Sequence, residues 1–272
     1  DILVRFSQAP SGVTAAYRLG WTVLLLLPVV LLRCRAELRR VTARDLVLCG
    51  ASGVLLALHF LTWFESLKRT SVASSTVLVS TEVIFTAMGF ALFLHGKIPR
   101  LGVWAILLAF GGSALLALSG GGGAGELSGN LLALAAASAA AVYTLIGRIQ
   151  RGHLSTTVYT FLTYLACFLT LLLGTAAAGT PLTGYGGREW LIGLALAVLC
   201  TLLGHSLFSW CLKYLSPSYV SAAKLCEPVF SSLAAIPLFG EVPGPLQLAG
   251  GAAVLGAVLL YTWAEREKTP AG

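Results

Sequence analysis

Residues 72–95 read VASSTVLVSTEVIFTAMGFALFLH, and this stretch decides the fold class. It is apolar over a length that suits a membrane-spanning helix, which needs about 20 residues. A transmembrane strand would be about 10 residues long and would alternate polar and apolar side chains, which this stretch does not do. One carboxylate, Glu82, lies in its middle. Ionisable side chains are costly inside a membrane, so Glu82 is the first candidate for a functional role.

The same apolar pattern continues on both sides of this stretch. Hydrophobic residues make up 57% of the 272 residues, charged residues only 11%, and the mean hydropathy is +0.86. Soluble domains carry about 25% charged residues. We predict an all-α polytopic membrane protein whose spans are near 11–32, 45–67, 72–95, 101–119, 127–147, 155–178, 189–212, 218–239 and 245–264.

The net charge of +7 indicates a membrane topology and not a nucleic-acid partner, because the basic residues lie in short loops between apolar runs. If the arginine-rich loop 33–44 is cytoplasmic, 12 of the 18 basic residues lie inside and four outside, while Arg18 and Lys224 lie within spans. This asymmetry predicts a multi-pass protein of the bacterial inner membrane with both termini cytoplasmic.

The two halves of the chain share a register. A shift of 145 residues aligns Glu82 with Glu227 at the same depth of two predicted spans. A shift of 143 residues aligns Arg5 with Arg148. Arg148 lies at the end of a full predicted span, so we interpret the first residues of the chain as the end of a first helix that is largely truncated. We therefore predict a ten-helix, five-plus-five arrangement. Five spans per half make the two repeats opposite in orientation, as in many secondary transporters.

This register predicts two repeats, residues 1–122 and 123–272. The glycine-rich stretch SGGGGAGELSGN (119–130) falls at their boundary and has the composition of a flexible linker. It is no phosphate-binding loop, because it lacks the Gly-Lys-Ser/Thr ending. We expect no nucleotide or other cofactor, and hence transport that is facilitated or coupled to an ion.

Three stretches carry a resemblance to a known family. They are AAYRLGWTVLLLLPVVLL (15–32), WFESLKRTSVASSTVLVSTEVIFTAMGFALFLHGK (63–97) and WCLKYLSPSYVSAAKLCEPVFSSLAAIPLFGEVP (210–243). With them the chain resembles the EamA-type branch of the drug/metabolite transporter superfamily. The first half departs from the family pattern, with EVIF where the second half has EPVF. The resemblance implies a ten-helix exporter that works by alternating access, with helices one, three, four, six, eight and nine around a central cavity.

The segment KLCEPVF (224–230) places two charges and a proline inside an apolar run. In one interpretation, Lys224 binds an anionic group of the substrate while Glu82 or Glu227 binds a cation or carries a proton. In the other, Lys224 and Glu227 neutralise each other across one helix face. Pro228 removes a helical hydrogen bond and predicts a kink in the second half only, since Val83 stands at the matching position.

Other polar and aromatic residues within spans are candidates for substrate binding. His59 and His205 could titrate near neutral pH or hydrogen-bond a neighbouring helix. Trp63, Trp210 and Tyr143 could line the cavity and stack on the substrate, or could anchor the protein at the lipid interface. The six cysteines show no metal-ligand spacing, so we expect no metal site.

Other functions were weighed against a transporter. GASG (50–53) is similar to the serine motif of rhomboid intramembrane proteases, with Ser52 as nucleophile and His205 as base, but no H-x-x-x-N element accompanies it. A lipid scramblase or flippase would need a hydrophilic groove open to lipid. We expect that the protein is not an enzyme.

The expected partners are a small-molecule substrate, most simply an amino acid or similar zwitterion, and the lipid bilayer. The chain is expected to be a monomer or a homodimer. A quaternary amine, nucleoside or sugar-like substrate is the alternative.

Overall fold

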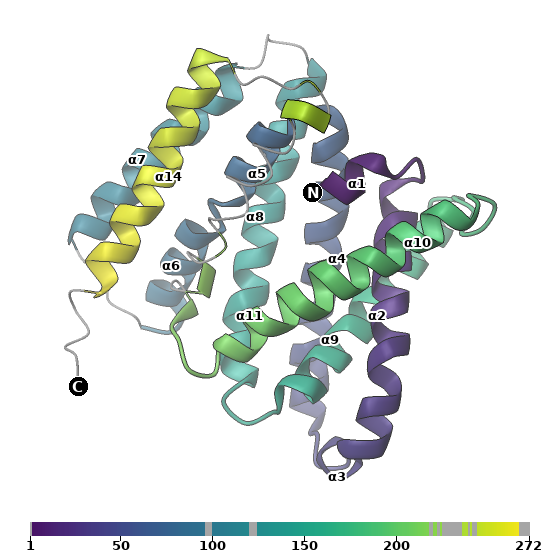
Figure 1. Cartoon of the computed structure of the whole chain (residues 1–272). Helices are drawn as coiled ribbons and strands as arrows, with labels where there is room; N and C mark the ends of the chain where they lie inside the picture. The colour runs from purple at the N-terminus through teal and green to yellow at the C-terminus, as the bar shows by residue number, and fades with distance from the viewer. Residues whose placement is uncertain are drawn as a thin grey trace. The chain divides into compact units, whose positions relative to one another are not determined.

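The computed structural model describes residues 2–95, 100–119, 124–217, 220–221, 224, 236–238, 240 and 244–266. Within these ranges the chain forms helices joined by short loops, and no strand is found (Figure 1). The helices are α1 Ile2–Phe6, α2 Ser11–Arg33, α3 Arg35–Leu38, α4 Ala43–Arg69, α5 Val72–Val79, α6 Glu82–Phe93, α7 Arg100–Ser119, α8 Ala124–Gln150, α9 Thr156–Ala177, α10 Gly187–Ala195, η1 Leu196–His205, α11 Ser206–Cys211 and α14 Pro245–Arg266.

The predicted membrane spans coincide with these helices. Among the described residues, six segments are long and apolar enough to cross a membrane: Ser11–Arg33, Ala43–Arg69, Ser74–Phe93, Glu126–Gln150, Thr156–Ala177 and Gly187–Cys211. Helices α7 and α14 cover the predicted runs 101–119 and 245–264. The predicted span 218–239 falls largely outside the described residues. The prediction of an all-α polytopic membrane protein is confirmed, while the ten-helix inverted repeat stays a prediction.

The span that contains Glu82 is interrupted, which the sequence did not predict. The Ser80 hydroxyl donates to the Thr76 carbonyl at 2.8 Å, and the Thr81 hydroxyl donates to the Leu78 carbonyl at 2.7 Å. Such local bonds compete with the regular helix ladder. The backbone tightens here, since the Thr81 N–H donates to the Leu78 carbonyl at 3.1 Å. Helix α5 ends at Val79, and Glu82 begins α6. The expectation that only the second half carries an interruption, at Pro228, is therefore wrong for the first half; Pro228 itself lies outside the described residues.

The chain divides into two compact units, which we describe separately. The α2–α9 unit comprises Leu3–Leu61 and Val142–Leu215, and the α7–α14 unit comprises Thr62–Ala141 and Ser216–Gly272 with Asp1–Ile2. Compactness is a different property from internal repetition, so the proposed repeats 1–122 and 123–272 stay a prediction.

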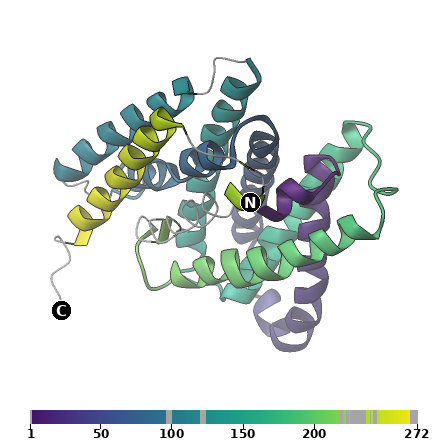
Figure 2. The same cartoon turned by 45° about the horizontal axis from the view of Figure 1, so that its top comes forward.

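Glycines set the closest helix contacts of the α2–α9 unit. A Cβ atom at Gly53 of α4 would lie 2.5 Å from the Thr163 carbonyl oxygen of α9. A Cβ at Gly193 of α10 would lie 2.7 Å from the Cβ of Tyr17 in α2. Small residues of this kind let membrane helices approach closely. Helices α10, η1 and α11 follow one another as one continuous helical path that packs on α2 (Figures 1 and 2).

Helices α7 and α14 form the centre of the α7–α14 unit and lie side by side in both views (Figures 1 and 2). A Cβ at Gly112 of α7 would lie 2.9 Å from the Gly250 carbonyl oxygen of α14, so the two backbones are in close contact there. Against this pair packs an apolar cluster that includes Val83 and Ile84 of α6. This packing fixes the first turn of α6, where Glu82 lies.

Candidate functional site

A buried ion pair occupies the α7–α14 unit. The Lys224 ammonium donates to both carboxylate oxygens of Glu82, at 2.8 and 3.0 Å, and the Ser221 hydroxyl donates to Glu82 at 3.2 Å. The Glu82 side chain is 7% exposed and that of Lys224 is 17% exposed. Charges so deep in an apolar segment are stable only when they are paired and hydrogen-bonded.

The position of Glu82 at the start of α6 adds to this stabilisation. The interruption at Ser80 and Thr81 makes Glu82 a first-turn residue. Backbone N–H groups at a helix start carry a partial positive charge that favours a carboxylate. Glu82 therefore interacts favourably with both the helix start and the ammonium of Lys224.

The partner of Lys224 was not identified from the sequence, which offered Glu227 at helical spacing. Glu227 lies outside the described residues, so a contact between it and Lys224 is not described. The observed partner, Glu82, is 142 positions away in the chain. Trp63, another predicted site residue of this unit, is 6% exposed, and its ring lies 5.9 Å from that of Phe64.

A second cluster lies in the α2–α9 unit and brings together three predicted residues. The rings of His59 from α4 and Tyr143 from α8 each lie 6.4 Å from the ring of His205, at the end of η1. The Tyr143 hydroxyl is 3.2 Å from the Ser209 hydroxyl. His59 and Tyr143 are both buried. Three helices thus converge on His205.

Arg18 belongs to the same cluster, although the sequence pattern placed it within a span without indicating a role in the site. It is 2% exposed, its Nε donates to the Thr201 hydroxyl at 2.7 Å, and its guanidinium lies 4.2 Å from the centre of the Phe60 ring. The Phe60 ring in turn meets His205 edge to face at 5.5 Å. Arg18 therefore does not extend to the membrane surface. Its depth within an apolar run was the signal that could have identified it.

The helix that carries Thr201 and His205 is wound more widely than an α-helix. Residues Leu196–His205 form a π-helix, and the Thr201 hydroxyl donates to the Leu196 carbonyl at 3.4 Å. π-Helical turns are rare and often lie at functional sites. Here the π-helix places the Thr201 hydroxyl within hydrogen-bond distance of the Arg18 guanidinium, and it ends at His205.

Two remaining residues lie apart from these clusters. Trp210 is 49% exposed and packs on Tyr214 with ring centres 5.1 Å apart, so its role in substrate binding stays a prediction. Ser52 is fully buried and shares a hydrogen bond of 2.9 Å with the Tyr159 hydroxyl. With Gly53 packed against α9, the GASG motif serves helix packing, and this argues against a serine nucleophile.

Comparison with known proteins identifies the family of the chain. The family model described as "EamA-like transporter family" matches residues 2–118 and 127–263, and the chain belongs to this family. This is a family of transporters, not of enzymes.

Named relatives are exporters. The chain is 24% identical over 207 residues to the "Pseudopaline exporter CntI" of Pseudomonas aeruginosa, covering 76% of this chain and 72% of the relative. It is 27% identical over 233 residues to a "Probable terminal-alkyne amino-acid exporter" of Streptantibioticus cattleyicolor, covering 82% and 75%. A solved structure titled "Crystal structure of protein" matches with a TM-score of 0.67 at 19% identity, covering 97% of this chain and 91% of the other, and this likeness concerns the fold alone.

Proposed function

We propose that this protein exports small zwitterionic metabolites, amino acids or similar molecules, across the bacterial inner membrane by alternating access. The family and the exporter names of two relatives support a small-molecule exporter. The observation that carries the zwitterionic class is the buried Glu82–Lys224 pair.

The pair explains how a zwitterion could be bound without leaving a charge alone in the membrane. The carboxylate of Glu82 and the ammonium of Lys224 satisfy each other at 2.8 Å. A bound zwitterion would offer its ammonium to Glu82 and its carboxylate to Lys224, so both charges would stay compensated. A neutral sugar or nucleoside offers no such exchange, and separating the pair for it would leave both charges uncompensated.

Proton coupling would use the same carboxylates. Protonation of Glu82 removes the charge that holds Lys224, which frees the ammonium for a substrate carboxylate. Glu227, at the matching position of the second half, is the other candidate. Substrate contact by His59, His205, Tyr143, Trp63 and Trp210 stays a separate prediction from the sequence.

The test is transport by the purified protein in liposomes. Radiolabelled amino acids, a nucleoside, a sugar and a quaternary amine would be supplied one at a time, with empty liposomes as control. We expect saturable flux of one or more amino acids and none of the sugar or nucleoside. Flux of the sugar, nucleoside or amine alone would overturn the zwitterionic class while leaving the exporter class intact.

A pH gradient imposed on the same liposomes tests the coupling. We expect Glu82→Gln or Glu227→Gln to abolish the increase in flux that the gradient produces. If both variants retained the full pH-driven increase, neither carboxylate would carry the proton.

A further inference from the structure

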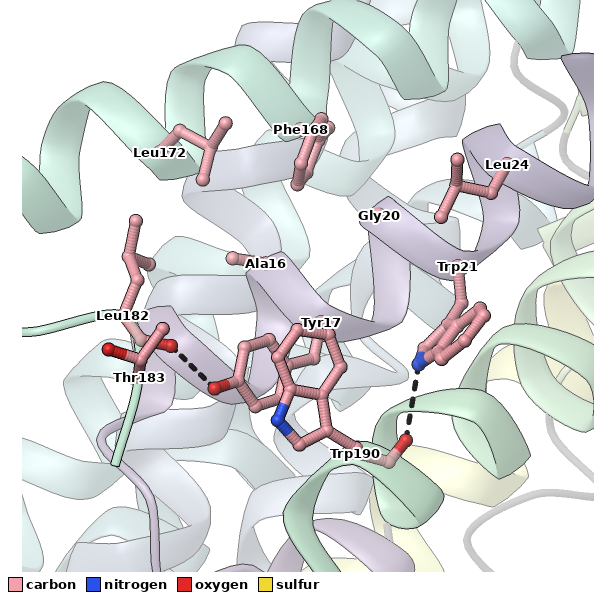
Figure 3. A pocket seen from close by; sticks show the side chains of 10 residues that line it. All are labelled: Ala16, Tyr17, Gly20, Trp21, Leu24, Phe168, Leu172, Leu182, Thr183 and Trp190. Carbon is pink, nitrogen blue, oxygen red and sulfur yellow. Dashed lines mark hydrogen bonds between the residues drawn. The ribbon is translucent and has the colours of Figure 1, made fainter. Parts of the chain in front are cut away.

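A pocket that no transport residue lines lies within the α2–α9 unit. It has a volume of about 290 Å³. Its walls come from α2, α9, the loop 178–186 and the start of α10 (Figure 3). The lining residues are Ala16, Tyr17, Gly20, Trp21, Leu24, Phe168, Leu172, Leu182, Thr183 and Trp190.

The lining is apolar because its aromatic polar groups bond to the backbone. The Tyr17 hydroxyl donates to the Leu182 carbonyl, and the Trp21 indole N–H donates to the Trp190 carbonyl at 3.2 Å (Figure 3). The lining residues include no charged side chain. A ligand with a charge or several hydrogen-bonding groups would lose its water there without compensation. The pocket therefore suits a hydrocarbon.

Close helix contacts on either side hold the pocket open. Gly12 packs against Thr175 of α9, where an added Cβ would lie 2.8 Å from the Thr175 hydroxyl. Gly193 packs against Tyr17 in the same way, at 2.7 Å. The Tyr17 and Trp190 rings stack at 4.2 Å and form one wall. These contacts fix α2 against α9 and α10, so the pocket does not close by a small shift of one helix.

The surroundings of the pocket point to the occupant. Leu24 and Trp190 line it and are 59% and 43% exposed, so the pocket continues to the outer surface of the unit. That surface carries exposed leucines of α9 and α10, Leu169, Leu173 and Leu191. In a membrane protein such side chains face acyl chains, and tryptophans of this kind are typical of the membrane–water interface. Lipid hydrocarbon is thus the apolar material next to the opening.

We propose that this pocket binds an acyl chain of a bilayer phospholipid. Its volume agrees, because a dry apolar cavity of about 150 Å³ already accommodates a benzene ring, and this pocket has about 290 Å³. The bound chain fills the space between α2 and α9 and stacks along the Tyr17–Trp190 wall. This proposal is independent of the substrate that the protein transports.

Photo-crosslinking in membranes tests the proposal. The full-length protein is reconstituted with a phosphatidylethanolamine that carries a diazirine within its acyl chain, irradiated, and the labelled residues are identified by mass spectrometry. We expect labels on Phe168, Leu172 and Trp21 that also form when irradiation follows exchange into detergent, in addition to labels on the exposed Leu169 and Leu173. Labels confined to the exposed leucines would overturn the proposal.

Two glycine variants supply the matched comparison. Gly20→Leu adds bulk to the α2 wall of the pocket, where an added Cβ already meets the Phe168 ring at 3.0 Å and that ring must shift. Gly174→Leu adds the same bulk to α9 where nothing lies within 4 Å. Displacing about two methylene groups of a bound chain lowers pocket labelling about tenfold in Gly20→Leu. Gly174→Leu should leave pocket labelling unchanged.

A second filling variant keeps the test decisive if Gly20→Leu does not fold. Leu172→Phe adds bulk from the α9 side and should also reduce labelling of Phe168 and Trp21. Equal pocket labelling in wild type and in the folded filling variant would contradict an acyl chain in the pocket. Displacement of the label by a transported amino acid would assign the pocket to the substrate instead, which also contradicts it.

Discussion

At the scale of single residues, Lys224 and Glu82 compensate each other's charge in an apolar environment. Each is expensive alone, and their contact at 2.8 Å removes most of that cost. A variant of only one partner therefore combines a loss of function with a loss of stability. The two effects can be separated by a double variant that removes both charges.

We expect Lys224→Met alone to lower both thermal stability and amino-acid flux, because it leaves the Glu82 carboxylate buried without its ammonium. Loss of one partner of a buried pair costs about 3–5 kcal/mol. The double variant Glu82→Gln with Lys224→Met should regain most of the stability and still transport at least about tenfold more slowly, a change of about 1.4 kcal/mol in the barrier. Thermal unfolding in detergent and liposome flux measure the two quantities. Full flux in the stable double variant would show that the pair has only a structural role.

Arg18 is held by a hydroxyl and an aromatic face. Its contact with Phe60, at 4.2 Å, is a cation–π interaction in a desolvated setting. Lysine can carry the charge but not the planar stacking and the forked donors.

A double-mutant cycle on Arg18 and Phe60 tests this contact. We expect Arg18→Lys and Phe60→Leu each to lower the unfolding midpoint, and the double variant to lower it by less than their sum. The coupling should be about 1–2 kcal/mol, the range of a buried cation–π contact. Val54, exposed on α4, supplies the control Val54→Ala, which should show no coupling with Arg18. Strict additivity of Arg18→Lys and Phe60→Leu would exclude a direct energetic contact.

At the scale of helices, adjacent glycines of α7 have different roles. Gly112 faces α14, where an added Cβ would lie 2.9 Å from a backbone oxygen, while Gly111 has nothing within 4 Å. The two positions therefore separate the effect of packing from that of helix propensity.

Gly112→Ala should destabilise the protein by about 1–3 kcal/mol, because the backbone of α14 must move away. Gly111→Ala, its matched control, should be neutral or stabilising by up to about 1 kcal/mol, since alanine favours a helix over glycine. Thermal unfolding of both variants in the same detergent makes the comparison. Equal effects at the two positions would contradict the close contact between α7 and α14.

The interruption between α5 and α6 shows why sequence reading at the helix scale was incomplete. Hydropathy predicted one span over 72–95, and the apolar length was correct. The hydroxyls of Ser80 and Thr81 bond to the backbone where α5 ends, although threonine makes such bonds within intact helices of this chain too. Composition alone does not reveal which hydroxyl bonds form, because this depends on the packing of the neighbouring helices.

At the scale of the whole molecule, the charge distribution predicts the orientation in the membrane. The arginine-rich loop 33–44 is predicted to be cytoplasmic, and the loop 178–186 to face the other side. The orientation and the five-plus-five repeat stay predictions.

Labelling of single cysteines in intact cells tests the orientation. In a cysteine-free background we expect Pro181→Cys to react with a membrane-impermeant maleimide and Arg39→Cys to react only after the membrane is permeabilised. Both positions are exposed, so the difference reports sidedness and not burial. The reverse pattern would invert the predicted topology.

The sequence by itself determined which segments are membrane helices and which family the chain belongs to, because hydropathy and span length are local properties that the bilayer imposes. It also indicated Glu82 and Lys224, since a charge in an apolar run is visible in one dimension. Only the tertiary structure decided that these two residues pair, that Arg18 lies over Phe60, and that an apolar pocket remains between α2 and α9. These three features depend on how closely helices that are distant in the sequence pack against one another. The packing distance is set by the side-chain volumes of several helices together.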